Sequence, residues 1–213
     1  MFPAGQLMKM YRLMLKRFGH QKWWPGETPF EICAGAILTQ NTNWQNVEKA
    51  IANLKKNRSL SLQKIHDMSP TALAELIRPA GYFNIKARRL QNFTSYIVEN
   101  HRGRLMDMLK QPMESLRNEL LSINGIGPET ADSILLYAAE KPSFVIDAYT
   151  RRIFSRHGLC DKNAAYHDLK KICEENLPSD VKLFNDYHAQ LVAVAKNYCK
   201  TVASCDGCPL AAI

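Results

Sequence analysis

The stretch LLSINGIGPETADSILLYAAEKPSFVIDAYTRR, residues 120–152, decides the fold. Within it, residues 123–127 alternate isoleucine and glycine around one asparagine, so the chain can reverse sharply while two isoleucines hold the turn against an apolar interior. Pro128 suits the first position of a helix, because its φ is already set and its missing N–H costs nothing there. The residues that follow carry apolar side chains at helical spacing. The pattern therefore predicts a helix, a glycine hairpin and a second helix.

A hairpin of this kind leaves backbone N–H groups free at the start of its second helix, where the helix dipole also favours an anion. Backbone donors contact phosphate whatever the base, so the hairpin could hold a nucleic-acid strand without reading its sequence. An ordinary helix–helix connection explains the five hairpin residues equally well when they are taken alone. The candidate phosphate-binding residues are Gly125, Ile126, Gly127 and Thr130.

Asp147 follows the apolar run at 144–146 and precedes a basic segment, residues 151–156. Taken alone, an aspartate in this place is best explained as a helix cap. The hairpin and Asp147 together, at this separation, resemble the helix-hairpin-helix DNA glycosylase superfamily, in which the catalytic aspartate follows the hairpin helix. The resemblance covers nearly the whole chain. It implies an all-α fold of two domains with a DNA cleft between them, and it makes Asp147 the expected catalytic residue.

Composition agrees with a polyanionic partner. Lysine and arginine outnumber aspartate and glutamate by 28 to 20 in 213 residues, which gives a net charge of +8. No apolar run approaches the ~20 residues that span a bilayer, and the first residues lack a signal-peptide cleavage site. We therefore expect a cytoplasmic protein that associates with double-stranded DNA as a monomer, without a membrane. Six cysteines in such a chain do not indicate a disulfide framework.

The segment before and after the apolar run at 30–38 resembles one branch of this superfamily closely. The phrase LTQNT, the WWP motif upstream and an aromatic residue two positions past the threonine are typical of the 3-methyladenine DNA glycosylase III type. There the matching residues line the pocket for the extruded base, although a tryptophan pair could also plug a domain junction. In the endonuclease III branch, a glutamine at this helix junction fills the gap left by that base. The resemblance assigns Trp23, Trp24, Pro25 and Trp44 to the base pocket and Gln40 to the wedge.

Breaking an N-glycosidic bond builds positive charge on the sugar, which a nearby carboxylate such as Asp147 can stabilise. Bifunctional relatives carry a lysine two residues beyond the last hairpin glycine, where it forms a Schiff base with the sugar. Glu129 occupies that position here, and a carboxylate cannot form an imine. We therefore predict a monofunctional glycosylase without lyase activity. A cationic alkylated purine such as 3-methyladenine is the expected substrate, because aromatic faces attract cations.

Three cysteines gather near the end of the chain, at Cys199, Cys205 and Cys208. Thiolates at this spacing bind iron–sulfur clusters or zinc. In the endonuclease III branch four cysteines here hold a structural [4Fe–4S] cluster, and the fourth would follow Ile213, where this sequence ends. We expect a [4Fe–4S] cluster completed in a longer product, with zinc or no metal as the alternatives.

The remaining chain predicts helices throughout and no alternating strand. An amphipathic helix is expected at 6–18, Asn43 and Ser69 suit helix caps, and Gly81 suits a helix stop. Lys86, Arg88 and Arg89 form a basic group that either contacts phosphate or is a solvated helix face. We expect a barrel of about six helices at 29–139, with the helix-hairpin-helix motif at about 120–138, and a second domain made of 1–28 and 140–213.

Two alternative functions remain open at this point. One is an endonuclease III-like glycosylase and lyase on oxidised pyrimidines that uses a different amine. The other is a DNA-binding protein without catalysis that recognises DNA structure.

Overall fold

The computed structural model describes residues 5–21, 23 and 26–213. Every regular element in these residues is helical, and one isolated β-bridge pairs Cys199 with Ala203, which confirms the all-α class. No helix in the described ranges is long and apolar enough to cross a bilayer. The chain divides into two compact units, each described by itself. We call residues 24–141 the hairpin unit, and residues 1–23 with 142–213 the terminal unit.

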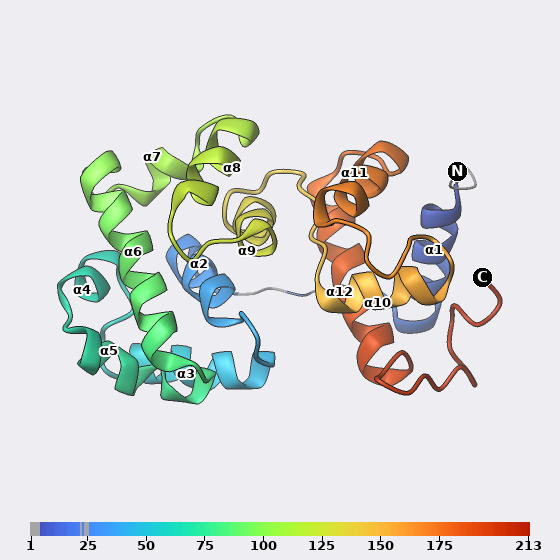
Figure 1. Cartoon of the computed structure of the whole chain (residues 1–213), viewed down its shortest axis with the longest axis horizontal. Helices are drawn as coiled ribbons and strands as arrows, with labels where there is room; N and C mark the ends of the chain where they lie inside the picture. The colour runs from blue at the N-terminus through green and yellow to red at the C-terminus, as the bar shows by residue number, and fades with distance from the viewer. Residues whose placement is uncertain (1–4, 22, 24–25) are drawn as a thin grey trace. The chain divides into compact units, whose positions relative to one another are not determined.

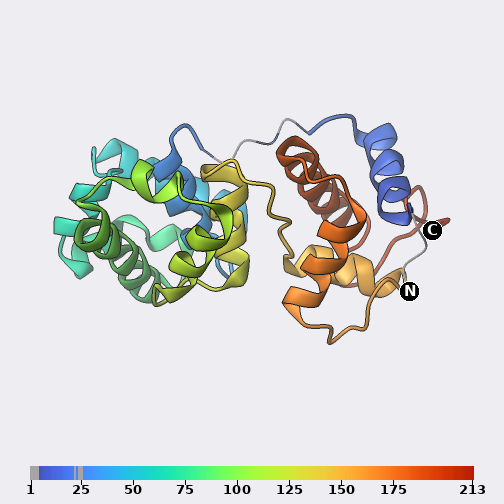
Figure 2. The same ribbon diagram turned by 90° about the horizontal axis from the view of Figure 1, so that it is seen from above.

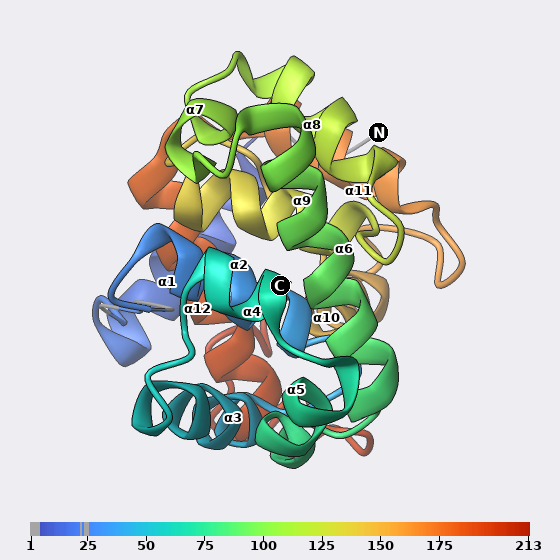
Figure 3. The ribbon, with the colours of Figure 1, turned by 90° about the vertical axis from the view of Figure 1, so that its left-hand side faces the viewer.

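The hairpin unit is built around the apolar helix α2 (Figures 1 and 3). Its core-facing side chains at Ile32, Ile37 and Leu38 are at most 3% exposed. Helix α2 packs on α3 and α6, and also on α9 and the π-helical turn η2, which come at the end of the unit. The long helix α6 packs against α4 and α5 in the same unit. The helices of this unit are α2 (Pro29–Leu38), α3 (Trp44–Lys56), α4 (Leu62–Asp67), α5 (Pro70–Leu76), η1 (Arg78–Ala80), α6 (Phe83–His101), α7 (Leu105–Leu109), α8 (Met113–Ser122), α9 (Pro128–Ser133) and η2 (Ile134–Ala138).

Local sequence signals set several of these helix ends. The side chain of Asn43 accepts a hydrogen bond from Asn46 N (3.1 Å), and that of Ser69 accepts one from Ala72 N (3.3 Å), so both predicted caps are confirmed. Gly81 has φ 69° directly after η1, a left-handed conformation that stops the helix as predicted.

The terminal unit joins the first helix of the chain to its last three (Figure 2). Tyr187 of α12 stacks on Tyr11 of α1 with ring centroids 5.4 Å apart, and its hydroxyl donates to Leu7 O (2.9 Å). Phe144 contacts Tyr187 edge-on at 5.5 Å, which brings the segment before Asp147 into the same core. The helices are α1 (Gln6–Phe18), α10 (Ala148–Arg156), α11 (Tyr166–Asn176) and α12 (Val181–Asn197).

The basic group on α6 does not form a single face. Lys86 is 1% exposed, and its Nζ donates to the carbonyls of Leu38 (2.8 Å) and Ala80 (2.7 Å), the last residues of α2 and η1. Both interpretations of Lys86, as a phosphate contact or a solvated lysine, are therefore wrong. A buried ammonium is tolerated here because it donates to carbonyls at the negative ends of two helices. Arg88 is exposed, whereas Arg89 turns toward the hairpin.

Candidate active site

The glycine hairpin joins α8 to α9 through residues 123–127. Ile123 and Ile126 are 4% and 5% exposed, so both anchor the turn in the apolar interior as predicted. Gly125 has φ 98°, in the left-handed region, and a Cβ placed there would lie 2.3 Å from Arg89 Cγ. A side chain at this position would be strained and would also collide with Arg89.

Gln40, the predicted wedge, makes hydrogen bonds through both ends of its amide. Its Nε2 donates to Gly125 O and to Thr130 Oγ1, each at 2.9 Å. Its Oε1 accepts a hydrogen bond from Arg89. The end of α2, the middle of α6 and the hairpin therefore meet at one polar side chain.

The four residues predicted to contact phosphate are not equally available. The N–H of Ile126 donates to Ile123 O (3.0 Å), so it is already paired within the turn. Thr130 is 6% exposed and accepts from Gln40. Gly127 is exposed, and a Cβ placed on it would meet nothing within 4 Å. Its open surroundings leave the backbone of Gly127 accessible to another molecule.

A buried ion pair holds the hairpin helix against the helix before it. Arg117 of α8 donates from Nε and Nη2 to the two carboxylate oxygens of Asp132 on α9, at 2.8 and 3.1 Å. Asp132 is fully buried, so loss of its partner would leave an uncompensated charge. Helix α9 then widens into η2, and such π-helical turns often occur at functional sites.

Asp147 caps helix α10 in the terminal unit. Its Oδ1 accepts from Thr150 N (2.7 Å), and its Oδ2 lies 3.4 Å from Nε2 of His188 on α12. The side chain is 15% exposed, and this burial acts to raise the pKa of Asp147. The nearby His188 ring, together with Thr150, outweighs burial and holds that pKa below its usual value. The cap interpretation is confirmed, and the carboxylate is ionised at neutral pH.

Trp23 packs on the same histidine. The ring centroids of Trp23 and His188 are 5.2 Å apart with planes tilted by 30°. A tryptophan predicted for the base pocket and the predicted catalytic aspartate thus contact one buried side chain, His188, which is 6% exposed. The other two predicted members of the WWP motif, Trp24 and Pro25, lie outside the described residues.

The sequence matches the family described as HhH-GPD superfamily base excision DNA repair protein over residues 34–179, a range that includes the hairpin and Asp147. The chain belongs to this superfamily. The two-unit helical structure with a hairpin between α8 and α9 is the fold of its DNA glycosylases.

Relatives of this HhH-GPD protein include several repair enzymes. It is 52% identical over 206 residues to a protein of Methanocaldococcus jannaschii provisionally named DNA repair glycosylase, covering 96% of this chain and 93% of that protein. It is 27% identical to endonuclease III of Thermotoga maritima over 194 residues, 90% of this chain and 84% of the relative.

Two solved structures are similar to this HhH-GPD protein. One is the 3-methyladenine DNA glycosylase MagIII of H. pylori bound to 1,N6-ethenoadenine, with TM-score 0.71, 29% identity, and coverage of 89% of this chain and 95% of that one. The other is a non-covalent endonuclease III–DNA complex, with TM-score 0.85, 21% identity, and coverage of 99% and 94%. The second likeness concerns the fold alone.

The predicted site residues of this HhH-GPD protein fall into two groups. Gln40 and the hairpin meet in the hairpin unit, whereas Trp23 and Asp147 meet at His188 in the terminal unit. Trp44 begins α3 in the hairpin unit, and its Nε1 donates to Glu48 (3.1 Å). Glu129 lies exposed in the first turn of α9.

Arginines of α10 hold the cysteine loop. Arg152 Nε donates to Cys199 O (2.8 Å), and Arg156 donates to Lys200 O and Thr201 O (2.7 Å each) and to Cys199 Sγ (3.1 Å). Among the described residues, no group of three histidine, cysteine, aspartate or glutamate side chains is placed to hold a metal ion.

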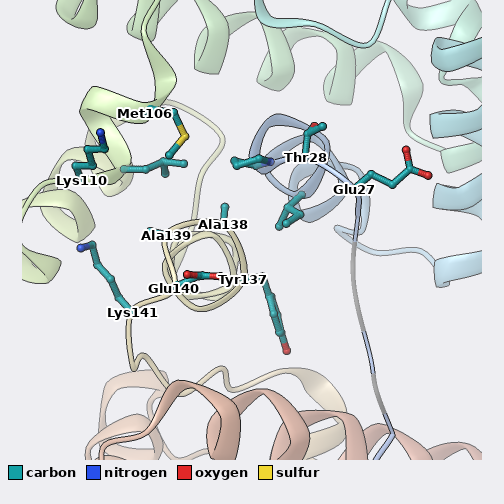
Figure 4. Close-up of a pocket in the computed structure, with 12 residues that line it drawn as sticks. Glu27, Thr28, Met106, Lys110, Tyr137, Ala138, Ala139, Glu140 and Lys141 are labelled. Atoms are coloured by element: carbon teal, nitrogen blue, oxygen red, sulfur yellow. The ribbon is translucent and has the colours of Figure 1, made fainter.

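A pocket of about 450 Å³ opens in the hairpin unit beside the start of α2, the end of η2 and α7 (Figure 4). Figure 4 shows Lys110 and Lys141 on one side of it and Glu27 and Thr28 on the other. None of the predicted site residues lines this pocket, and we assign no ligand to it.

Three features of the site were missed by sequence reasoning. They are the contact of His188 with Trp23 and Asp147, the Arg89 bond to Gln40, and the Arg117–Asp132 pair. Only His188 left a local signal, since it is a histidine inside the apolar run HAQLVAVA. Which residues it would meet depends on contacts between distant segments.

Proposed function

We propose that this HhH-GPD glycosylase is monofunctional and hydrolyses the N-glycosidic bond of alkylated purines such as 3-methyladenine in double-stranded DNA. The observation that carries the proposal is the cluster of Trp23, His188 and Asp147, in which an aromatic ring and an ionised carboxylate share one buried neighbour.

Asp147 is the proposed catalytic residue. Cleavage of the bond gives the deoxyribose oxocarbenium character, and a fixed carboxylate stabilises that charge and can orient or deprotonate the attacking water. The N-cap hydrogen bond from Thr150 N fixes one oxygen of Asp147. Its lowered pKa keeps the group in the anionic form that this role requires.

Glu129 supports the monofunctional part of the proposal. It occupies the place of the Schiff-base lysine of bifunctional relatives, in the first turn of α9, and no lysine lies between Gly125 and Glu140. Without an amine on this helix, hydrolysis by water is the remaining route to base release.

Aromatic side chains support the choice of substrate. An alkylated purine that carries positive charge is already a good leaving group, and it is attracted to the face of an indole ring. Trp23 offers such a ring beside the partner of Asp147. The similarity to a glycosylase that is named for 3-methyladenine and is bound to ethenoadenine points the same way. By the resemblance, Trp24, Pro25 and Trp44 complete the pocket.

DNA contact is proposed for the hairpin and for Gln40. The exposed Gly127 lets a phosphate approach the backbone at the start of α9, where the helix dipole also favours an anion. Gln40 is proposed as the wedge at the end of α2, held in place by Gly125, Thr130 and Arg89.

The proposed hydrolysis needs no redox centre, so a cluster at Cys199, Cys205 and Cys208 is a separate hypothesis. Its support is the spacing of the three cysteines. Its test is the iron and sulfide content of protein purified without oxygen. Iron with acid-labile sulfide would support the cluster, whereas zinc or no metal would support one of the two alternatives.

The test of the proposed function is base release from duplexes that carry one 3-methyladenine, 7-methylguanine or thymine glycol, with and without later alkali. We expect release of the methylated purine, strand breaks only after alkali, and loss of both with Asp147→Asn. Breaks at thymine glycol without alkali would instead show a lyase on oxidised pyrimidines. Binding of abasic DNA without release of any base would show a DNA-binding protein.

A further inference from the structure

His188 is the one side chain that contacts both Trp23 and Asp147 in the described interactions of the terminal unit. It lies on the buried face of α12, two residues after Asp186. The carboxylate of Asp186 is bound to Tyr11, His20 and Gln21 instead, at 2.8 to 3.0 Å. Asp147 is therefore the carboxylate that faces His188, and Trp23 is the aromatic neighbour.

We propose that His188 is a positioning residue for base excision, which orients the free oxygen of Asp147 and holds the ring of Trp23. The inference rests on the proposed function of Asp147 and adds to it a residue on another helix. No role in the reacting bond is assigned to His188 itself.

The geometry of Asp147 explains why a second partner matters. Its Oδ1 is occupied by the cap bond from Thr150 N, and this bond alone leaves the carboxylate free to rotate about χ2. The Nε2 atom of His188, 3.4 Å from Oδ2, is a second contact of the carboxylate and restricts its rotation. A restricted carboxylate keeps one oxygen oriented toward the sugar. Small misplacements of a reacting group reduce the reaction rate strongly.

Trp23 gives His188 a second task. An indole with its centroid 5.2 Å from the imidazole is held at a defined tilt, so a base stacked on Trp23 is placed relative to Asp147 through the same ring. Loss of the nitrogen atoms alone should disturb Asp147 and leave Trp23 packed. Loss of the ring should disturb both.

Two variants separate these tasks. His188→Phe keeps a ring for Trp23 and removes the nitrogen that faces Asp147, whereas His188→Gln keeps a polar donor and removes the ring. The matched control is His20→Phe, which removes another histidine–carboxylate pair, with Asp186, from the same unit. Each variant is measured for the single-turnover rate of 3-methyladenine release, for affinity to abasic DNA, and for the pKa of Asp147 by carbon-13 NMR.

For His188→Phe we expect base release to slow on the order of 10- to 100-fold with unchanged affinity for abasic DNA. The pKa of Asp147 should rise, and Asp147→Asn combined with His188→Phe should be no slower than Asp147→Asn alone. His188→Gln should recover part of the rate, and His20→Phe should match the wild type.

A wild-type rate and an unchanged Asp147 pKa in His188→Phe would overturn the inference. In that case, base release by the wild-type protein would still support the proposed function. If the wild type releases no base, the proposed function fails, and the pKa of Asp147 still decides whether His188 controls that carboxylate. An equal loss of rate and of DNA affinity in both variants would show a purely structural role and would also overturn the inference.

Discussion

At the scale of single residues, the cap formed by Asp147 and its proposed catalytic role were alternatives in the sequence but do not exclude each other in the structure. The cap interpretation and the catalytic interpretation competed because an aspartate before a helix satisfies either. In the structure one carboxylate oxygen caps α10 and the other faces His188, so the cap leaves the second oxygen available for another role. A structural bond and a proposed catalytic role are compatible in this side chain.

The stability of the protein should report the lowered pKa of Asp147. Asp147→Asn keeps an N-cap, because asparagine caps helices about as well as aspartate. A carboxyl whose pKa is lower in the folded state stabilises the protein above its unfolded pKa of about 3.9, and this contribution is lost as pH falls through the folded pKa. We therefore expect the wild type to lose its advantage over the variant only below about pH 4. Urea unfolding across pH 2 to 7 measures this, and a constant difference would contradict it.

Lys86 should also make stability rise with pH, but in the alkaline range. Burial, and then the charge of Arg89, lower its pKa from 10.5 to about 8. Between these values the unfolded chain binds the proton that the folded chain has lost, so stability rises with pH. The free energy of unfolding of the wild type should therefore increase relative to Lys86→Met from about pH 8 to 10. Lys49→Met, which changes an exposed lysine of α3, is the control and should show no such trend.

At the scale of elements, the hairpin shows which parts of a structure local sequence can predict. Alternating isoleucine and glycine ahead of a proline predicted the turn and its anchors correctly, because both depend on neighbouring residues. The same pattern could not show that Ile126 N–H is already paired, or that Arg89 and Gln40 close over the turn. Those contacts come from α2 and α6, which lie far from the hairpin in sequence.

The two hairpin glycines should respond differently to alanine. Gly125→Ala places a side chain at φ 98° and 2.3 Å from Arg89 Cγ, so we expect a loss of about 2–4 kcal/mol in the free energy of unfolding. Gly127→Ala meets no atom within 4 Å and should leave stability within about 1 kcal/mol. If DNA approaches this glycine, the same variant should bind abasic duplex more weakly. Thermal unfolding and a binding titration separate the two effects, and normal binding by Gly127→Ala would remove the proposed contact.

At the scale of the whole molecule, the helices were more predictable than their assembly. The helix at Gln6–Phe18 was predicted with its observed ends, because a regular apolar period and flanking glycines define it locally. The meeting of Trp23, Asp147 and His188 could not be derived in the same way. These three residues lie in segments more than forty residues apart in the sequence, and no local sequence pattern predicts that such segments meet. The site was therefore found by resemblance, and its third member only by the structure.

The net charge of +8 belongs to the whole chain, but DNA binding should depend on where that charge lies. Lys196 and Lys200 are exposed on either side of Cys199, whose loop the arginines of α10 hold in place. If this surface contacts phosphate, each lysine releases counterions on binding, and its removal should reduce the slope of log affinity against log salt by about 1. Lys171→Ala, which removes a lysine paired with Glu175 on α11, is the control. Unchanged salt-dependence slopes for Lys196→Ala and Lys200→Ala would assign the phosphate contacts to other surfaces. Reduced slopes with an unchanged single-turnover rate of base release would show that this loop contributes to DNA binding alone.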